Sequence, residues 1–227
     1  IAKDPNTYEH IDPALVGNTR VIPMSNQAGQ SNLRKRLSDA GLAVAKGDPA
    51  LGRILEVVKD REAQGYAYDT AQASFELLAR DVMDQLPHLF EVERYRVTVE
   101  RRRNAEGRMV SLSEAVVVVD VDGEKRLSVS ESLDEDGADR GPVNALSKAL
   151  VKDLGKYSSL LDDMRLVDFK VRITQGGTEA TTRVIIDSED GQGRRWSTVG
   201  VSANILDASF EALLDAIRWK LIRDRAQ

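Results

Sequence analysis

The sequence contains no cysteine, two histidines and 5% aromatic residues among its 227 residues. The lack of cysteine excludes disulfide bonds, thiolate catalysis and thiolate-bound zinc or iron–sulfur clusters. It is compatible with a reducing compartment, and we expect a cytoplasmic protein. His10 and His88 lie in separate segments and match no metal-ligand spacing. We therefore expect neither a metal site nor a cofactor in this chain.

Long apolar runs and an excess of positive charge are also lacking. No apolar run approaches the roughly 20 residues of a membrane-spanning helix, and the N-terminus lacks a signal-peptide core, so we expect no membrane contact. A net charge of −5 argues against binding nucleic acid. Arg101–Arg103 is basic but is expected to be a solvated hairpin end. An RNA-binding βαβ module is an alternative, although no exposed aromatic pair for base stacking is evident.

Familiar catalytic motifs are missing as well. The sequence has no GxSxG nucleophile elbow, no P-loop and no GxGxxG loop. Gly191–Gly193 is not followed by a helix and is predicted to form a hairpin turn. The acidic residues Glu131, Asp134, Glu135 and Asp136 lack the ligand order of an EF-hand, which favours a solvated loop.

Residues 1–30 are predicted to form an extended connector, because Pro5, Pro13 and Pro23 interrupt any helix there. The chain lacks an initiator methionine, so we expect a fragment of a longer protein. Residues 31–88 are predicted to form a helical subdomain. Its first helix is expected from Ser31 to Gly41, its second from Asp48-Pro49 to Gly65, and its third behind a capping box of Asp69 and Gln72.

Residues 89–227 read as a duplicated βββα unit, with copies at about 89–157 and 164–225. The first strand of each copy alternates apolar and polar residues, as in Tyr95, Val97 and Val99 or Phe169, Val171 and Ile173. Sequence echoes link the copies: Glu114-Ala115 with Glu179-Ala180, Arg126 to Val129 with Arg195 to Thr198, and Gly141 to Ala145 with Asn204 to Ala208. We predict an α+β fold in which two sheets pack face to face with the helices outside.

The turn that leads into each helix is the candidate binding site. Backbone N–H groups at a helix start are unpaired and attract a carboxylate, so two facing helix starts are able to hold an amino-acid zwitterion. The predicted effector-binding residues are Gly141, Pro142, Val143, Asn144, Ala145, Ser202, Asn204, Ile205, Asp207 and Ala208.

Five ordered blocks carry a resemblance to a known family: Thr7–Asn18, Ser25–Leu33, Gly141–Leu146, Arg165–Ile173 and Trp196–Ile205. Together they span nearly the whole chain. The sequence resembles the C-terminal half of the 2-isopropylmalate synthase, homocitrate synthase and citramalate synthase family. The citramalate synthase branch is the most similar.

The resemblance implies a parent acyltransferase of branched-chain amino acid biosynthesis. Such an enzyme condenses acetyl-CoA with a 2-oxo acid, pyruvate in the citramalate branch, on a TIM barrel that binds a divalent metal. The resemblance places the barrel and its metal ligands upstream of Ile1, so this chain is expected to be inactive alone. Tyr8 corresponds to a connector tyrosine that reaches the partner subunit's barrel, where a phenol can orient a thioester or pass a proton.

The resemblance further implies that the duplicated domain forms a homodimer and binds isoleucine or leucine as an effector. One departure is the segment Leu133–Arg140, which is longer than the family's Gly-Asn-Gly-Pro loop. Arg140 either adds a partner for the effector carboxylate or occludes the pocket. The alternative hypothesis is a purely structural dimerisation module that binds no effector.

Overall fold

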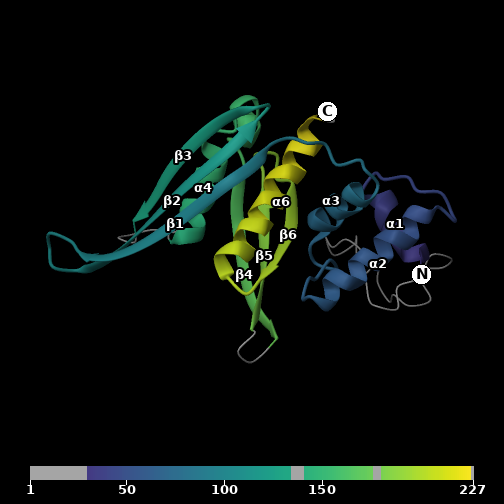
Figure 1. The fold of residues 1–227 in the computed structure, drawn as a ribbon, viewed down its shortest axis with the longest axis horizontal. Coiled ribbons are helices and arrows are strands. Elements are labelled where there is room, and N and C mark those ends of the chain that lie inside the picture. Colours follow the sequence, from purple (N-terminus) through teal and green to yellow (C-terminus); the bar gives the residue numbers. More distant parts are fainter. Residues whose placement is uncertain (1–29, 134–140, 176–179, 226–227) are drawn as a thin grey trace.

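The computed structural model describes residues 30–133, 141–175 and 180–225 (Figure 1). The predicted connector with Tyr8, and Arg140 in the inserted segment, lie outside the described residues. No helix among the described residues is long and apolar enough to cross a membrane.

The three predicted helices are confirmed as α1 (Gln30–Asp39), α2 (Pro49–Ala63) and α3 (Gln72–Val82). Asp48 caps α2 by accepting a hydrogen bond from the backbone N–H of Ala50 at 2.8 Å. The predicted capping box of Asp69 and Gln72 is wrong. Gln72 is the first residue of α3 and not its third, and Asp69 instead accepts from the N–H of Thr70 at 3.0 Å.

The predicted duplication is seen as two antiparallel sheets, each with its strands in sequence order. The first contains β1 (Glu91–Arg103), β2 (Met109–Val121) and β3 (Glu124–Leu133), and α4 (Pro142–Lys152) follows it. The second contains β4 (Arg165–Gln175), β5 (Thr181–Glu189) and β6 (Arg195–Ser202), and α6 (Ile205–Arg225) follows it. A short 3₁₀ turn, Gly155–Tyr157, and α5 (Ser158–Leu161) connect the copies.

Strand register shows which residues of the two copies correspond. Tyr95 pairs with Val117 and Phe169 pairs with Ile186, and each first strand has a register shift just before that aromatic residue. Tyr95 and Phe169 are therefore equivalent. A bulge repeated at one position supports a common origin for the copies, because β-bulges are usually conserved within a protein family.

The same register corrects two of the sequence echoes. Ala115 pairs with Val97, and its counterpart opposite Val171 is Val184, not Ala180. In the third strands, Ser128 pairs with Val117 and Thr198 pairs with Ile186, which shifts the predicted equivalence by one residue. The longer turn between β5 and β6, where Gly193 has a φ of 76°, accounts for the offset.

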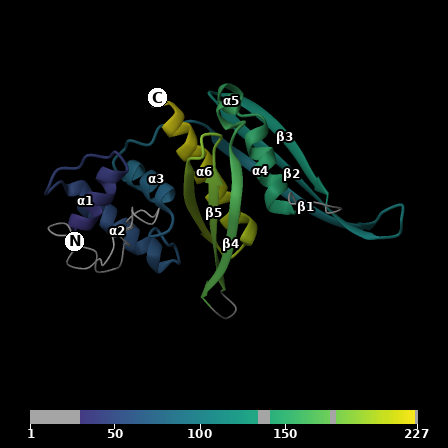
Figure 2. The same ribbon diagram turned by 180° about the vertical axis from the view of Figure 1, so that it is seen from behind.

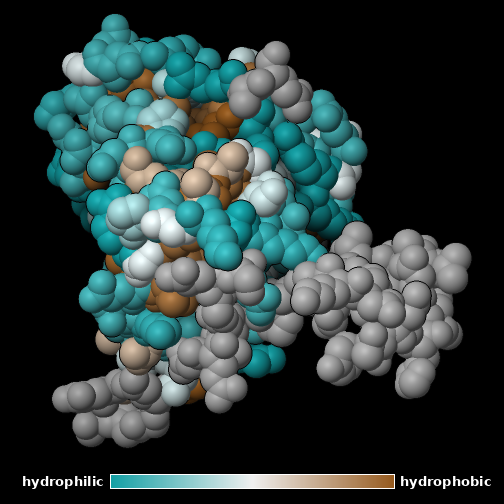
Figure 3. Space-filling view, turned by 90° about the vertical axis from the view of Figure 1, so that its right-hand side faces the viewer, coloured by the Kyte–Doolittle hydropathy of each residue, from teal (hydrophilic) through white to brown (hydrophobic). Residues whose placement is uncertain are grey.

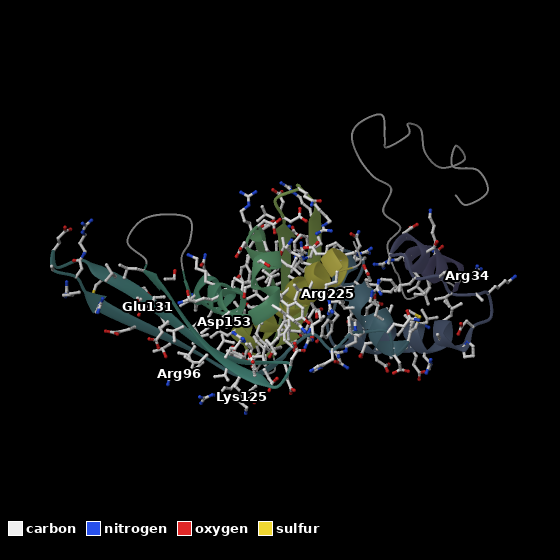
Figure 4. All side chains as sticks on the ribbon, turned by 90° about the horizontal axis from the view of Figure 1, so that it is seen from above. Arg34, Arg96, Lys125, Glu131, Asp153 and Arg225 are labelled. Atoms are coloured by element: carbon white, nitrogen blue, oxygen red, sulfur yellow. The ribbon has the colours of Figure 1, made fainter. Side chains whose placement is uncertain are left out.

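The predicted layering is also corrected, because α4 and α6 lie between the two sheets and not outside them (Figure 4). One core joins residues of β2 and β5 to both helices, for example Val117, Leu150, Ile186 and Leu213. The outer face of the first sheet is polar, with ion pairs such as Arg96–Glu114 and Lys125–Glu93. Each sheet has one strongly apolar face, which its helix must cover, so the helices lie inside. Figure 2 shows α4 from behind, next to β4.

Helices α1, α2 and α3 form a second core, which reaches the sheet through Val199 of β6. The outer edge of β6 is covered, because the N–H of Val199 donates to Ser74 Oγ at 3.0 Å and the N–H of Val201 donates to Glu211 Oε2 at 3.0 Å. Figure 3 shows the side of the molecule that carries these helices, where hydrophobic patches alternate with hydrophilic surface.

The first strands leave apolar residues uncovered. The alternation predicts one buried face on β4, yet Val167, Val171 and Ile173 are exposed, Ile173 by 72%. The equivalent Val99 of β1 is exposed as well. Both strands extend past the helices that cover their inner faces (Figure 1), so their far ends offer apolar surface to another molecule.

Candidate functional site

A cavity of about 640 Å³ lies between α4 and β4, at the seam between the two copies. Its wall is formed by residues of α4, the start of β4, β5 and α6. They are Pro142, Val143, Asn144, Ser147, Lys148, Val151, Met164, Arg165, Leu166, Phe169, Ser188 and Leu213. Its size is within the range of small-molecule sites in proteins.

The start of α4 supplies hydrogen-bond donors to this cavity. Gly141 precedes the helix with a φ of 87° and makes no side-chain cap, and Pro142 at the first position has no N–H. The first hydrogen bond within the helix runs from the N–H of Ala145 to the carbonyl of Gly141, at 3.2 Å. The N–H of Val143 therefore has no acceptor in the helix and lies at the positive end of the helix dipole.

The rest of the wall combines one orphaned hydroxyl with apolar surface. Ser188 is fully buried, and its Oγ has no hydrogen-bond partner among the described residues. A buried polar group without a partner is costly, which makes it a natural contact for a ligand. Phe169, Val151 and Leu213 provide the apolar part of the wall, and Lys148 adds positive charge.

The predicted site residues fall into two groups. Pro142, Val143 and Asn144 line the cavity, Gly141 precedes them at the helix start, and Ala145 is buried in the core. The other predicted residues, Ser202, Asn204, Ile205, Asp207 and Ala208, lie at the start of α6 and do not line this cavity. The predicted meeting of two helix starts around one ligand therefore stays a prediction.

The start of α6 is already occupied by the protein's own groups. Asn204 Oδ1 accepts a hydrogen bond from the N–H of Leu206 at 2.9 Å and so caps the helix. The ring of Tyr95 stacks on Phe210 with 4.4 Å between the centroids, and its hydroxyl donates to Asp207. Burial and this hydrogen bond raise the pKa of Tyr95, so its hydroxyl keeps its proton.

One substitution between the copies explains why only one helix start is open. Helix positions correspond with an offset fixed by their first residues, Pro142 and Ile205, so Ser147 is equivalent to Phe210. Phe210 fills the space under Tyr95, whereas Ser147 leaves the space next to Phe169 empty. Sequence reasoning missed Ser147, Phe169 and Ser188, although the contrast between a serine and a phenylalanine at matched positions was a visible signal.

Comparison with known proteins gives one family and a set of curated relatives. Residues 69–221 match the family model described as the LeuA allosteric (dimerisation) domain. An (R)-citramalate synthase of Synechocystis sp. is 43% identical over 97% of this chain and 39% of its own length. An (R)-citramalate synthase of Aquifex aeolicus is 38% identical over 100% of this chain and 41% of its own length.

A 2-isopropylmalate synthase of Methanocaldococcus jannaschii is 29% identical over 93% of this chain and 37% of its own length. The chain thus spans about two fifths of the length of these relatives. The family match covers both βββα copies together with α3. The chain belongs to the family of LeuA allosteric (dimerisation) domains.

Proposed function

We propose that this chain is the regulatory and dimerisation part of an acyltransferase that condenses acetyl-CoA with a 2-oxo acid, and that it binds a branched-chain amino acid as its effector. The cavity at the open start of α4 carries the proposal. The family description and the relatives named citramalate synthase support the transferase assignment. Isoleucine is the proposed effector and pyruvate the proposed 2-oxo acid, and a cytoplasmic location stays a prediction.

The cavity offers a separate partner for each part of an amino acid. The effector carboxylate is placed at the N–H of Val143, where the helix dipole and Lys148 favour negative charge. The ammonium group is placed at the hydroxyl oxygens of Ser147 and Ser188. The aliphatic side chain then lies against Phe169 and the rest of the apolar wall.

The family supports a homodimer, and the exposed apolar residues of β4 are the proposed contact surface. Leu166, Val167, Val171 and Ile173 lie along this strand, and Leu166 also lines the cavity. A partner subunit covering β4 would therefore lie beside the bound effector. This placement couples effector binding to the packing of the dimer, which is what an allosteric domain requires.

The catalytic part of the proposal concerns Tyr8 and a barrel that belongs to a longer protein. Among the described residues, no group of three or more His, Cys, Asp or Glu side chains is arranged to bind a metal ion. We assign the divalent metal to the barrel of a longer protein and derive no metal-dependent step from this chain. Tyr8 is proposed to complete the partner subunit's barrel, and it lies outside the described residues.

Calorimetry with isoleucine, leucine and valine tests the sensor assignment. At 100–1,000 times its dissociation constant, an effector is expected to stabilise the fold by roughly 3–4 kcal/mol. Ser147→Phe, which copies Phe210 into the cavity, is expected to abolish binding, whereas Ser159→Phe on the exposed side of α5 serves as a matched control. Absence of binding by all three amino acids would leave the purely structural dimerisation module as the remaining function.

The exposed apolar residues of β4 also favour the purely structural dimerisation module, because a dimer interface is sufficient to explain their exposure in one subunit. Sedimentation is expected to show a dimer under either hypothesis, so ligand binding discriminates between them. Replacing the exposed Ile173 by Lys is expected to weaken the dimer, because a charge would enter an apolar interface. Unchanged dimer stability in this variant would place the interface elsewhere.

A further inference from the structure

A second cavity, of about 290 Å³, lies between the helices α2 and α3 and the helix α6. It is distinct from the seam cavity, because the two share no lining residue. Its charged and polar lining residues are Arg61, Tyr66, Tyr68, Ser74, Asp81, Glu211, Asp215 and Arg218. Its apolar lining residues are Val57, Leu77, Leu78, Val82, Leu86, Val199 and Leu214.

Several of the polar groups are already paired and so form a fixed frame. Tyr66 donates its hydroxyl proton to Glu211 at 2.6 Å and accepts from Arg61 at 2.8 Å. Ser74 donates to Asp215 Oδ2 at 2.6 Å. Both oxygens of Glu211 are occupied, because its Oε2 accepts from the backbone of Val201.

Two polar groups of the cavity wall have no hydrogen-bond partner among the described residues. Tyr68 is 3% exposed and stacks on Tyr66, yet its hydroxyl makes no hydrogen bond to a described residue. The second oxygen of Asp215, Oδ1, likewise lacks a partner, since Arg218 forms no ion pair within 4.0 Å and lies over the ring of Phe90. A nearly buried hydroxyl and a carboxylate oxygen are thus left for a ligand.

The balance of charge specifies which ligand fits. Three carboxylates, those of Asp81, Glu211 and Asp215, face two guanidinium groups, those of Arg61 and Arg218. Arg61 lies 3.7 Å from Glu211, and neither Asp81 nor Asp215 forms an ion pair with a described residue. Tyrosine rings and an apolar wall favour an organic cation over a hydrated metal ion.

We propose that this cavity binds a small organic ammonium compound, whose ammonium group lies between Asp215 and the hydroxyl of Tyr68. Its short aliphatic chain lies against Leu77, Leu78 and Leu214. Such a compound is either a simple amine or an amino acid, and the amino acid would add a carboxylate that Arg218 binds. The site joins the helices to α6, so an occupant would stiffen the contact between the helical region and the second copy.

The protonation of Asp215 supports the assignment. Burial raises the pKa of Asp215 to about 7, and the nearby Glu211 adds to the rise. An ammonium ion requires the ionised carboxylate, so binding is expected to strengthen as the pH rises from 6 to 8. The groups that face Asp215 are Arg61 of α2, Tyr66 and Tyr68 of the following loop, Ser74 and Asp81 of α3, and Glu211 and Arg218 of α6.

The test uses the 227-residue chain carrying Ser147→Phe, so that the seam cavity is filled and this proposal is separated from the proposed function. The probes are 3-methylbutylammonium, leucine and 4-methylpentanoate, which share an aliphatic tail and differ in their charged groups. Calorimetry at pH 8 is expected to show binding of 3-methylbutylammonium and no binding of 4-methylpentanoate. Tighter binding of leucine than of the amine would identify an amino acid, and the reverse would identify a simple amine.

Asp215→Asn keeps an acceptor for Ser74 and is expected to weaken binding of the amine at least about tenfold, the cost of a lost charged hydrogen bond. It is also expected to remove the pH dependence. Asp60→Asn, at an exposed position of α2 outside the cavity, is the matched control and is expected to bind as the parent does. Equal binding in Asp215→Asn, or no binding of the amine at millimolar concentration by the folded protein, would overturn the proposal.

Discussion

The two βββα copies use one scaffold for different purposes. Tyr95 of the first copy is stacked on Phe210 and hydrogen-bonded to Asp207, so the start of α6 is filled. The equivalent Phe169 of the second copy faces Ser147, and the start of α4 opens onto a cavity. A duplicated fold can therefore keep its core in both copies and still leave a cavity at only one of the two equivalent helix starts.

The helices differ in the same way. Helix α4 has 11 residues and no side-chain cap, whereas α6 has 21 residues and is capped by Asn204. The added length of α6 reaches the helical region, where Arg223 pairs with the buried Glu76 of α3 at 2.6 Å. The helix of the first copy thus borders the open cavity, and the helix of the second copy provides the attachment to α3.

The largest expected effect tests whether the copies share one core. Leu150 and Leu213 are equivalent residues, each 1% exposed, and both belong to the central cluster. Replacing either by Ala is expected to cost about 2–5 kcal/mol of the free energy of unfolding, through lost burial and a residual cavity. Denaturant titration is expected to show one transition for both variants. Separate transitions would mean that the copies fold independently.

A second substitution is expected to affect only the second copy. A Cβ atom at Gly200 would lie 2.0 Å from the carbonyl oxygen of Ala208, because β6 and α6 approach closely there. Gly200→Ala is therefore expected to cost about 1–3 kcal/mol or more. By register, Ser130 is the counterpart in β3, and Ser130→Ala is expected to change stability by less than about 0.5 kcal/mol. Similar losses in both variants would contradict the tighter packing of α6.

The pH dependence of stability is expected to arise from the second copy at Asp215, whose counterpart in α4 is Lys152. Burial raises the pKa of Asp215 from 3.8 to about 7, so the folded state holds this proton more strongly than the unfolded state does. The free energy of unfolding is therefore expected to fall as the pH rises from about 4 to about 7. Asp215→Asn is expected to remove about 2 kcal/mol of this fall, since water at the cavity wall screens part of the charge.

Denaturant titrations at pH 4, 6 and 8 measure that dependence for the parent and for Asp215→Asn. Lys152→Gln is the control in the first copy, where Lys152 donates to the carbonyl of Val129 at 2.7 Å on the surface. A parent stability that rises between pH 4 and 7 in step with the ionisation of Asp215 would contradict the assigned pKa.

The smallest expected effect concerns the filled helix start. Tyr95→Phe keeps the ring on Phe210 but removes the hydrogen bond to Asp207, at an expected cost of about 0.5–1.5 kcal/mol. Phe169→Tyr, the mirror change in the other copy, places a hydroxyl in the open cavity and is expected to cost less. Equal costs in the two variants would mean that the helix starts are not as different as their contacts indicate.

Periodicity and turn chemistry were sufficient to predict the α+β class, the order of elements and the duplication. The turn at Asp122-Gly123, where both φ angles are positive, is an example in which the residue types determine the structure. The order of sheets and helices was not predictable from the alternation of apolar and polar residues. Alternation indicates that Phe169 and Val117 are buried, but it does not show whether a helix or the other sheet covers them. The helices lie between the sheets because both sheets need cover on their inner face.

The candidate site was predicted in part. An unpaired helix start follows from local sequence, so Pro142, Val143 and Asn144 were found. Phe169 and Ser188 come from the other copy and meet α4 only in the folded molecule, so no local pattern contains them. The equivalence of Ser147 with Phe210 follows from the sequence echo of Gly141–Ala145 with Asn204–Ala208, but the rings that these positions face, Phe169 and Tyr95, are known only from the fold.

A structure of the dimer crystallised with isoleucine tests the central claim most directly, namely that only the start of α4 is open to a ligand. We expect electron density for one amino acid per subunit between the N–H of Val143 and the ring of Phe169, with Tyr95 still stacked on Phe210. Density at the start of α6, with Tyr95 displaced and the α4 cavity empty, would contradict the account.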